Sequence, residues 1–387
     1  MQAAQIVDAF AVSAPGIGEI TAQELASLGI GPAVIEHGGV SFRASQSDLY
    51  SANLHLRTAT RIVVRIAAFH ASSFAELERR ATKIEWERWL PAAGEVKFRV
   101  TCKKSRLYHS DAVAERLMNA AAKHCANLDF AVAAKDDDGG DSPTSQLFIV
   151  RLLHDDVTIS ADSSGDLLHR RGYRPESTKA SLRETLAAAM LLSSDWDRGI
   201  ALLDPMCGSG TIPIEAAMMA GRIAPGISRK FAFEKWRSFD DELWQSLRAK
   251  AIDEELTDAG APIFGGDRDA GAVEVATRNA ERAGVAENIE FRMRPLAESL
   301  DALAAAPQTG AAVITNPPYG MRVSGGADLR NLYGMLGARA EKNHWSLGVL
   351  TADDKLARQS ANLASRFRTQ NGGIPVTFFA SECATEV

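Results

Sequence analysis

The residue types best suited to chemistry lie in the segment Thr315-Asn316-Pro317-Pro318-Tyr319-Gly320. Two consecutive prolines fix φ and remove two backbone donors, so the carbonyls and the Asn316 amide oxygen remain as acceptors in a stiff frame. Such a frame suits a planar exocyclic amine: Asn316 Oδ1 and the Pro317 carbonyl accept its two N–H groups, while Tyr319 stacks on a flipped-out base. These hydrogen bonds draw the nitrogen lone pair out of conjugation, and the nitrogen can then attack an electrophilic methyl group. The alternative is a rigid loop without chemistry.

A second segment, residues 204–211 (DPMCGSGT), follows an apolar stretch and opens directly into a predicted helix. Gly208 and Gly210 allow the backbone to approach a ligand closely, and the helix N-terminus offers unpaired N–H groups to a carboxylate or phosphate. The loop is not a Walker A motif, because no Gly-Lys-Ser/Thr follows, and Pro213 replaces the third glycine of a dinucleotide fingerprint. A tight strand-to-helix turn without a ligand is the competing interpretation.

A third segment, Gly265-Gly266-Asp267-Arg268-Asp269, follows the next predicted strand. An acid at such a strand end is placed to accept hydrogen bonds from both hydroxyls of a ribose, although Asp269 could instead cap the following helix. The interval before it contains an inserted segment, residues 222–261, which we expect to pack beside the site. A Gly-rich loop, a ribose acid and Asn-Pro-Pro-Tyr at successive strand ends together predict an amino-methyltransferase that uses S-adenosylmethionine.

These segments need a parallel sheet to bring them together. In the C-terminal half, strands are predicted at 200–203, 262–265, 289–293, 311–315 and 347–351, and helices at 179–192, 212–220, 270–283, 296–305 and 329–342. This alternation predicts βαβ units in a mainly parallel, doubly wound α/β sheet, in which ligands bind beyond the carboxyl ends of the strands. Before residue 162, shorter strands alternate with helices, which indicates one or two small α+β units.

Length and composition limit the class of protein further. A chain of 387 residues that is 46% hydrophobic and 24% charged is expected to form two or three domains. No apolar run is long enough to cross a bilayer, and residues 1–14 lack the features of a signal peptide, so we expect a cytoplasmic protein without a membrane partner. The four cysteines form no CxxC pair, which argues against a disulfide framework or a metal site.

The net charge of −6 argues by itself against a nucleic-acid partner, since such affinity comes mainly from neutralisation of phosphates by Lys and Arg. The average conceals an asymmetry. Residues 57–106 hold twelve basic and five acidic side chains, whereas residues 251–310 hold five basic and twelve acidic ones. On charge alone, solvated helix faces would explain both segments equally well.

On these motifs the sequence resembles the bacterial THUMP-domain RNA methyltransferases, which include guanine-N2 enzymes of 23S ribosomal RNA and their transfer-RNA relatives. The likeness spans nearly the whole chain and includes APG at 14–16, NLHLRTA at 53–59, CKKSRLYH at 102–109, HRRGYR at 169–174, LRETLA at 182–187, the 204–211 loop, APG at 224–226, FAFEKW at 231–236 and NPPYG at 316–320. The resemblance implies a ferredoxin-like unit at 1–55, a THUMP RNA-binding domain at 56–162, a basic linker at 163–178 and a Rossmann-like class I methyltransferase domain at 179–387.

The resemblance also implies roles for individual residues. The residues expected to bind S-adenosylmethionine are Asp204, Pro205, Cys207, Gly208, Gly210, Asp267 and Arg268. The target base would be received by Asn316, Pro317, Pro318 and Tyr319. The residues expected to bind RNA are Arg99, Lys103, Lys104, Arg106, Arg170, Arg171 and Arg174. In one respect the sequence departs from the family: Arg294 and Pro295 stand where an acid usually binds the adenine amine, and main-chain groups would have to replace it.

The preferred function is methylation of the exocyclic N2 of a guanosine in 23S ribosomal RNA, with transfer RNA as an alternative substrate. DNA amino-methyltransferases and protein-glutamine methyltransferases share the Asn-Pro-Pro-Tyr loop, but the N-terminal half resembles an RNA-binding module. A cysteine-dependent pyrimidine C5 mechanism is disfavoured, because Cys207 lies in the cofactor loop. A ribosome-assembly factor that binds RNA and cofactor without turnover is a further class that the motifs allow. No metal is expected.

Overall fold

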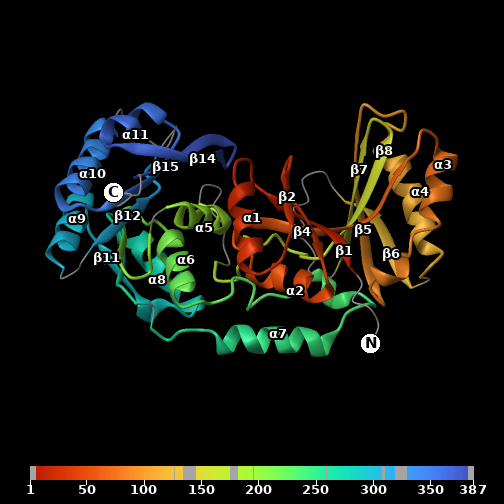
Figure 1. Ribbon diagram of the computed structural model, residues 1–387, viewed down its shortest axis with the longest axis horizontal. Coiled ribbons are helices and arrows are strands. Elements are labelled where there is room, and N and C mark those ends of the chain that lie inside the picture. Colours follow the sequence, from red (N-terminus) through yellow and green to blue (C-terminus); the bar gives the residue numbers. More distant parts are fainter. Residues whose placement is uncertain are drawn as a thin grey trace. The chain divides into compact units, whose positions relative to one another are not determined.

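The computed structural model describes residues 6–125, 127–133, 145–174, 182–194, 196–258, 260–306, 310–318 and 329–381. Figure 1 shows the chain with its elements labelled. It forms two compact units. The first contains the N-terminal strand up to Ser13, Thr21–Leu168 and Ser228–Lys250, and the second contains Ala14–Ile20, His169–Ile227 and the chain from Ala251 onward.

The first unit is built on an eight-stranded sheet with the order β2-β3-β1-β4-β8-β7-β5-β6. Its strands are β1 (Val7–Ser13), β2 (Ala33–Glu36), β3 (Gly39–Ala44), β4 (Ala59–His70), β5 (Gly94–Lys103), β6 (Leu128–Val132), β7 (Gln146–Leu153) and β8 (Asp156–Asp162). Strand β5 is parallel to β6 and β7, and the other neighbours are antiparallel. Because β4 pairs with β1 on one side and β8 on the other, the regions predicted as a ferredoxin-like unit and a THUMP domain share one continuous sheet.

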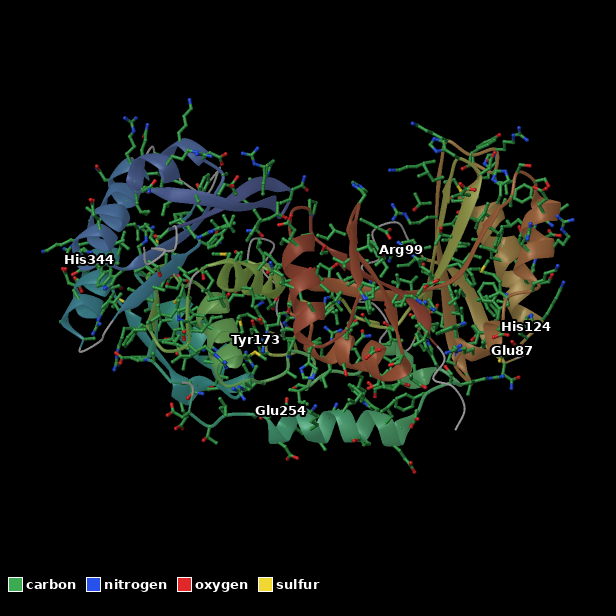
Figure 2. The ribbon with its side chains drawn as sticks, viewed as in Figure 1. Glu87, Arg99, His124, Tyr173, Glu254 and His344 are labelled. Atoms are coloured by element: carbon green, nitrogen blue, oxygen red, sulfur yellow. The ribbon has the colours of Figure 1, made fainter. Side chains whose placement is uncertain are left out.

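Serine side chains cap the starts of two helices in this unit. The helices are α1 (Gly18–Ser27), α2 (Gln46–His55), α3 (Phe74–Ala81), α4 (Ser110–Ala122) and α7 (Asp241–Asp253), of which α1 begins and α7 ends in residues of the second unit. Ser45 and Asp48 form a capping box at the start of α2, and Ser73 caps α3. Helices α3 and α4 pack together, and α4 covers β5 and β6 with the buried Leu117 against the sheet. On the same unit, Glu87 pairs with His124 (Figure 2).

The segment Ser228–Lys250 packs with the first unit through aromatic side chains. The rings of Tyr50 and Phe233 stack with their centroids 4.3 Å apart, and Trp89 meets Trp236 edge-on at 5.0 Å. Burial of such rings dominates the energy of a small core, and these partners lie far apart in the sequence. Of the predicted insertion, Ser228–Lys250 therefore belongs to the first unit, whereas its flanks up to Ile227 and from Ala251 onward belong to the second.

The second unit contains a seven-stranded sheet with the order β11-β10-β9-β12-β13-β15-β14. Its strands are β9 (Ala201–Asp204), β10 (Ile263–Asp267), β11 (Ile289–Met293), β12 (Ala311–Thr315), β13 (Ser346–Thr351), β14 (Leu363–Asn371) and β15 (Ile374–Ser381). Strands β9 to β13 are parallel, and β15 runs antiparallel to β13 and β14. The predicted mainly parallel α/β sheet is confirmed, and the antiparallel hairpin β14-β15 adds to it.

Helices cover both faces of this sheet. They are α5 (Glu184–Ser193), α6 (Thr211–Ala220), α8 (Ala270–Arg282), α9 (Leu296–Ala305), α10 (Leu329–Asn343) and α11 (Asp354–Ser360). Alternate strand residues enter different cores: Leu202 and Ile314 pack with α5, α6 and α8, whereas Leu203 and Val313 pack with α9 and α10. None of the helices in the described part of the chain is long and apolar enough to span a membrane.

Candidate active site

The parallel strands bring the three predicted segments to one edge of the second unit's sheet. Strand β9 lies between β10 and β12, with Asp204 opposite Gly265 and Leu203 opposite Val313. Since all three strands run in the same direction, the residues that follow them lie at their common carboxyl edge. The sheet therefore places the Gly-rich loop, Asp267 and the Asn316 loop next to one another.

Asp204 is a buried acid at the centre of this edge, with 2% of its surface exposed. Its Oδ1 accepts hydrogen bonds from the Thr315 hydroxyl at 2.7 Å and from the Met206 N–H at 3.1 Å. Burial raises the pKa of this carboxyl to about 7, the two hydrogen bonds oppose the rise, and the charge of Asp267 adds to it. Among the described residues no cation pairs with Asp204, so a cationic ligand group would compensate its charge.

The two glycines of the loop both have positive φ, but the space around their Cβ positions differs. Gly210 precedes α6 with φ +81°, and a Cβ at this position would lie 2.9 Å from the Cβ of Ala276. Gly208 has φ +51°, but no atom lies within 4 Å of its Cβ position. Packing therefore requires a glycine at 210, while Gly208 keeps open the space that a ligand would occupy.

Asp267 braces this loop from the end of β10. Its Oδ2 accepts a hydrogen bond from the Gly208 N–H at 2.9 Å, and its Oδ1 accepts one from the Asp269 N–H at 3.0 Å. Asp269 itself caps α8, with its side chain accepting from the Gly271 N–H, as the alternative interpretation predicts. Asn279, which the sequence analysis missed, donates to the Ser209 carbonyl at 3.0 Å from inside α8. No local motif distinguishes Asn279 from an ordinary helix residue.

Asn316 and Pro317 lie directly after β12, and Pro317 is buried. The Oδ1 atom of Asn316 is buried and accepts no hydrogen bond from any residue that the structure describes. A buried acceptor without a donor is costly, which is the state expected of a group held for a ligand donor. Pro318 is exposed, whereas Tyr319 and its predicted stacking role lie outside the described residues.

The donors and acceptors at this edge fit S-adenosylmethionine. The Asp204 carboxylate would receive the ammonium group, Asp267 would receive the ribose hydroxyls, and the space above Gly208 admits the nucleoside. The Cys207 thiol is buried, and burial together with the nearby acids raises its pKa, so it stays protonated. A neutral thiol is a poor nucleophile, which argues against a cysteine mechanism. Within the described residues no cluster of His, Cys, Asp and Glu is arranged to hold a metal ion.

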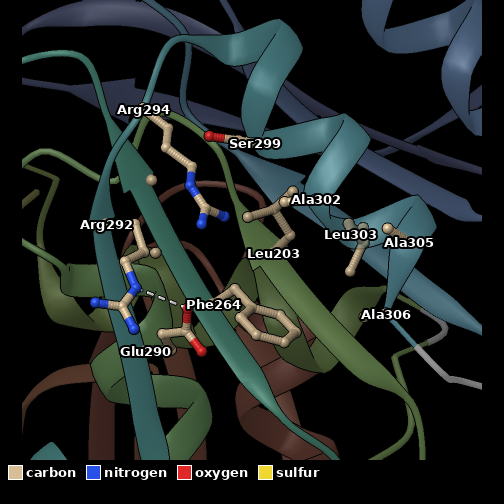
Figure 3. A pocket seen from close by; sticks show the side chains of 12 residues that line it. Leu203, Phe264, Glu290, Arg292, Arg294, Ser299, Ala302, Leu303, Ala305 and Ala306 are labelled. Carbon is tan, nitrogen blue, oxygen red and sulfur yellow. Dashed lines mark hydrogen bonds and ion pairs between the residues drawn. The ribbon is translucent and has the colours of Figure 1, made fainter.

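A cavity of about 440 Å³ opens beside this edge, between β10, β11 and α9 (Figure 3). Its floor includes Leu203 and Phe264, and an ion pair of 2.8 Å joins Arg292 to Glu290 on its wall. Arg294, the residue that departs from the family pattern, also lines it, and the Ser299 hydroxyl is buried there without a hydrogen bond to the described part of the chain. The cavity borders Gly266 but contains none of the predicted cofactor residues.

The predicted RNA-binding residues of the first unit lie on and after β5. Arg99 (Figure 2) and Lys103 share one face of this strand because they are four residues apart, and Lys103, Lys104 and Arg106 are exposed. The Nε and Nη2 atoms of Arg99 are buried and make no hydrogen bond to the described residues. Arg106 lies 3.8 Å from the carboxylate of Asp155. Lys103, Lys104 and Arg106 are therefore open to solvent, whereas Arg99 is half-buried.

The connector residues behave differently, and the structure corrects two of them. Arg171 is 4% exposed, and its Nε lies 3.3 Å from the carboxylate of Glu215 on α6. Arg174 pairs with Glu184 at 3.0 Å and donates to the Thr211 hydroxyl at the start of α6. Arg171 and Arg174 therefore hold the connector in place and do not face solvent, because the side chain of each is buried beside an acid of a following helix. The third of the set, Arg170, is exposed.

The fold and the site together define a class I methyltransferase, the class that uses S-adenosylmethionine. The sheet is doubly wound and mainly parallel. An acid and a Gly-rich turn follow its first strand, a second acid follows the next strand, and an Asn-Pro-Pro loop follows the fourth. The chain belongs to the family of RMKL-like methyltransferases, whose methyltransferase domain matches residues 171–374. The RlmL ferredoxin-like domain matches residues 8–63.

Similar proteins include both longer and equally long chains. The ribosomal RNA large subunit methyltransferase K/L of Syntrophotalea carbinolica is 34% identical over 94% of this chain, but the match spans only 52% of that protein. The protein slr0064 of Synechocystis sp., which carries a provisional RNA methyltransferase name, is 31% identical over 96% of both chains. The chain thus spans about half the length of the K/L protein and nearly all of slr0064.

Solved structures share the architecture over the whole chain. SMU.472, crystallised with S-adenosylhomocysteine, is 28% identical and superposes with a TM-score of 0.83 over 97% of this chain and 98% of that one. A protein of Listeria monocytogenes, described by prediction as an N6-adenine-specific DNA methylase, is 30% identical with a TM-score of 0.82 over 98% of this chain and 96% of that one.

Proposed function

We propose that the chain transfers a methyl group from S-adenosylmethionine to the exocyclic N2 of a guanosine in RNA, with 23S ribosomal RNA as the preferred substrate and transfer RNA as the second. The observation that carries the proposal is the Oδ1 of Asn316, which is buried without a partner among the described residues and directly follows the strand next to the one that ends in Asp204. An exocyclic amine offers the N–H donors that this acceptor lacks. The name of the K/L relative supports ribosomal RNA as the substrate.

The residues of the chain act mainly by positioning and by excluding water. Asn316 Oδ1 and the Pro317 carbonyl accept the two N–H groups of the base, and Tyr319 stacks on its ring. Asp204 and Asp267 hold the ammonium group and the ribose. When bound, S-adenosylmethionine supplies an electrophilic methyl group on a sulfonium. The new N–C bond forms as the S–C bond breaks, and the amine then loses a proton to water.

The RNA is proposed to contact Arg99, Lys103, Lys104 and Arg106 at the end of β5. This part of the chain corresponds to the proposed THUMP domain at 56–162, after a ferredoxin-like unit at 1–55 and before a linker at 163–178. The methyltransferase domain is proposed at 179–387; within this range, Ser228–Lys250 packs with the first unit. The chain is proposed to act in the cytoplasm, where its RNA substrates are found.

Transfer of labelled methyl groups to RNA from a strain that lacks the protein tests the activity. Wild-type protein should label the RNA. Asn316→Ala should abolish labelling while its affinity for S-adenosylhomocysteine stays within about threefold of wild type. Asn343→Ala is the matched control and should transfer labelled methyl groups to RNA as wild type does. Asn343 ends α10 just before β13, so it lies at the opposite edge of the sheet. Normal turnover in Asn316→Ala, or loss of its cofactor binding, would contradict the assignment.

The substrate class follows from the same assay run with ribosomal RNA, transfer RNA, DNA and release-factor peptide. Mass spectrometry of digested RNA should find N2-methylguanosine at one position. Labelling of DNA or peptide, with none in RNA, would replace the proposal by one of the other amino-methyltransferase classes. Cofactor binding without transfer to any acceptor would favour the assembly factor.

A further inference from the structure

The Thr315 hydroxyl joins the two halves of the proposed site. Thr315 is fully buried at the end of β12, and its hydroxyl donates to Asp204 Oδ1 over 2.7 Å from the neighbouring strand β9. It is also the residue directly before Asn316. One side chain therefore contacts the acid proposed to receive the cofactor, while its backbone leads into the loop proposed to receive the base.

The hydrogen bond has a fixed direction. Threonine is branched at Cβ, so a strand backbone restricts its χ1, and full burial leaves the hydroxyl little freedom to turn. The second donor to Asp204, the Met206 N–H at 3.1 Å, reaches the same oxygen, Oδ1. Both neutral donors thus hold one carboxylate oxygen, and no described residue donates to Oδ2. This arrangement orients the second oxygen for a ligand.

We propose that Thr315 is a positioning residue for methyl transfer: its hydroxyl holds the Asp204 carboxylate in the orientation that receives the ammonium group of the cofactor, and so sets the cofactor against the Asn316 loop. The inference rests on the proposed function and adds a residue that acts through Asp204 and is not itself proposed to contact the cofactor or the base. Loss of the hydroxyl leaves the carboxylate with a single donor. Binding of the cationic amino-acid end then weakens, and the carboxyl binds its proton more tightly.

The test replaces Thr315 by valine, which keeps the shape and removes the donor. Binding of S-adenosylhomocysteine is measured by titration calorimetry across neutral pH. A hydrogen bond to a charged group predicts that Thr315→Val binds about ten- to a hundredfold more weakly. The pH at which binding reaches half its maximum should move upward, since the hydroxyl lowers the pKa of Asp204. Thr315→Ser, which retains the donor, should restore most of the affinity.

Thr351→Val is the matched control. Thr351 is also fully buried at the end of a parallel strand, but its hydroxyl contacts the Tyr333 hydroxyl at 2.7 Å and not Asp204. It should lose stability as Thr315→Val does and keep wild-type cofactor affinity and pH dependence. Wild-type affinity and an unmoved midpoint in folded Thr315→Val would overturn the proposal.

If Thr315→Val does not fold, Thr315→Ser decides, because its hydroxyl can rotate. Its binding should stay within about fivefold of wild type, and Thr315→Ala, which lacks the hydroxyl, should bind about ten- to a hundredfold more weakly with a raised midpoint; equal affinity of the Ser and Ala variants would overturn the proposal. Failure of wild-type protein to bind S-adenosylhomocysteine would instead overturn the proposed function itself. The two failures are therefore distinguishable.

Discussion

Removing either partner of the ion pair between Arg171 and Glu215 should lower the free energy of unfolding of the second unit and leave RNA binding unchanged. Arg171 Nε and Nη2 lie 3.3 and 3.5 Å from the two carboxylate oxygens, and the side chains are 2% and 0% exposed. The Tyr173 hydroxyl donates to the same carboxylate at 3.3 Å. Removing either partner leaves a buried ion without its main counter-charge, which costs about 3 to 5 kcal/mol. Out of a total stability of about 5 to 15 kcal/mol, this is a large fraction.

The assay is urea unfolding followed by tryptophan fluorescence, with RNA binding measured over a series of salt concentrations. Arg171→Ala and Glu215→Ala should each lower the free energy of unfolding by about 3 to 5 kcal/mol. The double variant Arg171→Met with Glu215→Leu should recover most of the loss, because apolar residues of similar volume leave no unpaired charge. At a temperature where each variant is folded, the salt dependence of RNA binding should equal that of wild type.

A different result would restore the sequence-based role of Arg171. If Arg171→Ala unfolds at the wild-type urea concentration, and its plot of log affinity against log salt loses about 0.7 to 0.9 in slope, Arg171 contacts a phosphate. The reasoning from burial would then be refuted. Arg174→Met gives an independent check, because Arg174 is paired with Glu184 in the same unit.

Three further outcomes are expected. Gly210→Ala should lower the free energy of unfolding by roughly 2 to 4 kcal/mol, because residue 210 has a φ of +81° and its Cβ position is crowded. Gly208→Ala should mainly weaken binding of S-adenosylhomocysteine. Urea unfolding and calorimetry of both variants check this, and a destabilised Gly208→Ala with a weakly binding but stable Gly210→Ala would contradict it. The ligand-free protein should lose stability as pH rises toward 7, because the pKa of Asp204 is about 7 in the folded protein against an ordinary 3.8. The stability that the protonated Asp204 contributes is fully present below pH 3.8 and is lost as pH rises through 7. In urea unfolding curves measured over this range, Asp204→Asn should flatten the pH dependence. Lys103→Ala and Arg99→Ala should each weaken RNA binding and reduce the slope of log affinity against log salt concentration by about 0.7 to 0.9. Filter binding over a series of salt concentrations measures this slope. An unchanged slope would show that neither side chain contacts a phosphate.

Much of the second unit could be predicted because its signals are local. The bounds of β11, β12 and α9 agree with the predicted residues, since each element carries a clear apolar pattern and ends at a polar or proline-containing loop. The strands β14 and β15 carried no prediction. The pairing of β15 with β13 depends on contacts that no short window of sequence contains.

The charges show the limit of local reasoning most clearly. Arg61 belongs to the basic segment 57–106, yet it is buried against Asp162 and donates to the Gly165 carbonyl at 2.9 Å. Lys103, from the same segment, is exposed. A count of charges cannot separate the two, because burial of an arginine depends on whether the fold supplies an acid beside it.

The sequence by itself determined the chemistry that the second unit offers: the residue types after each strand, the glycines that the cofactor loop requires and the two prolines that stiffen the Asn316 loop. Short-range sterics and hydrogen-bonding capacity decide these properties, and both can be read from neighbouring residues. Only the tertiary structure showed that Ser228–Lys250 belongs to the first unit, that Arg171 supports α6 and that Thr315 donates to Asp204. Each of these depends on groups distant in the chain, whose burial and partners are set when the sheets and helices pack.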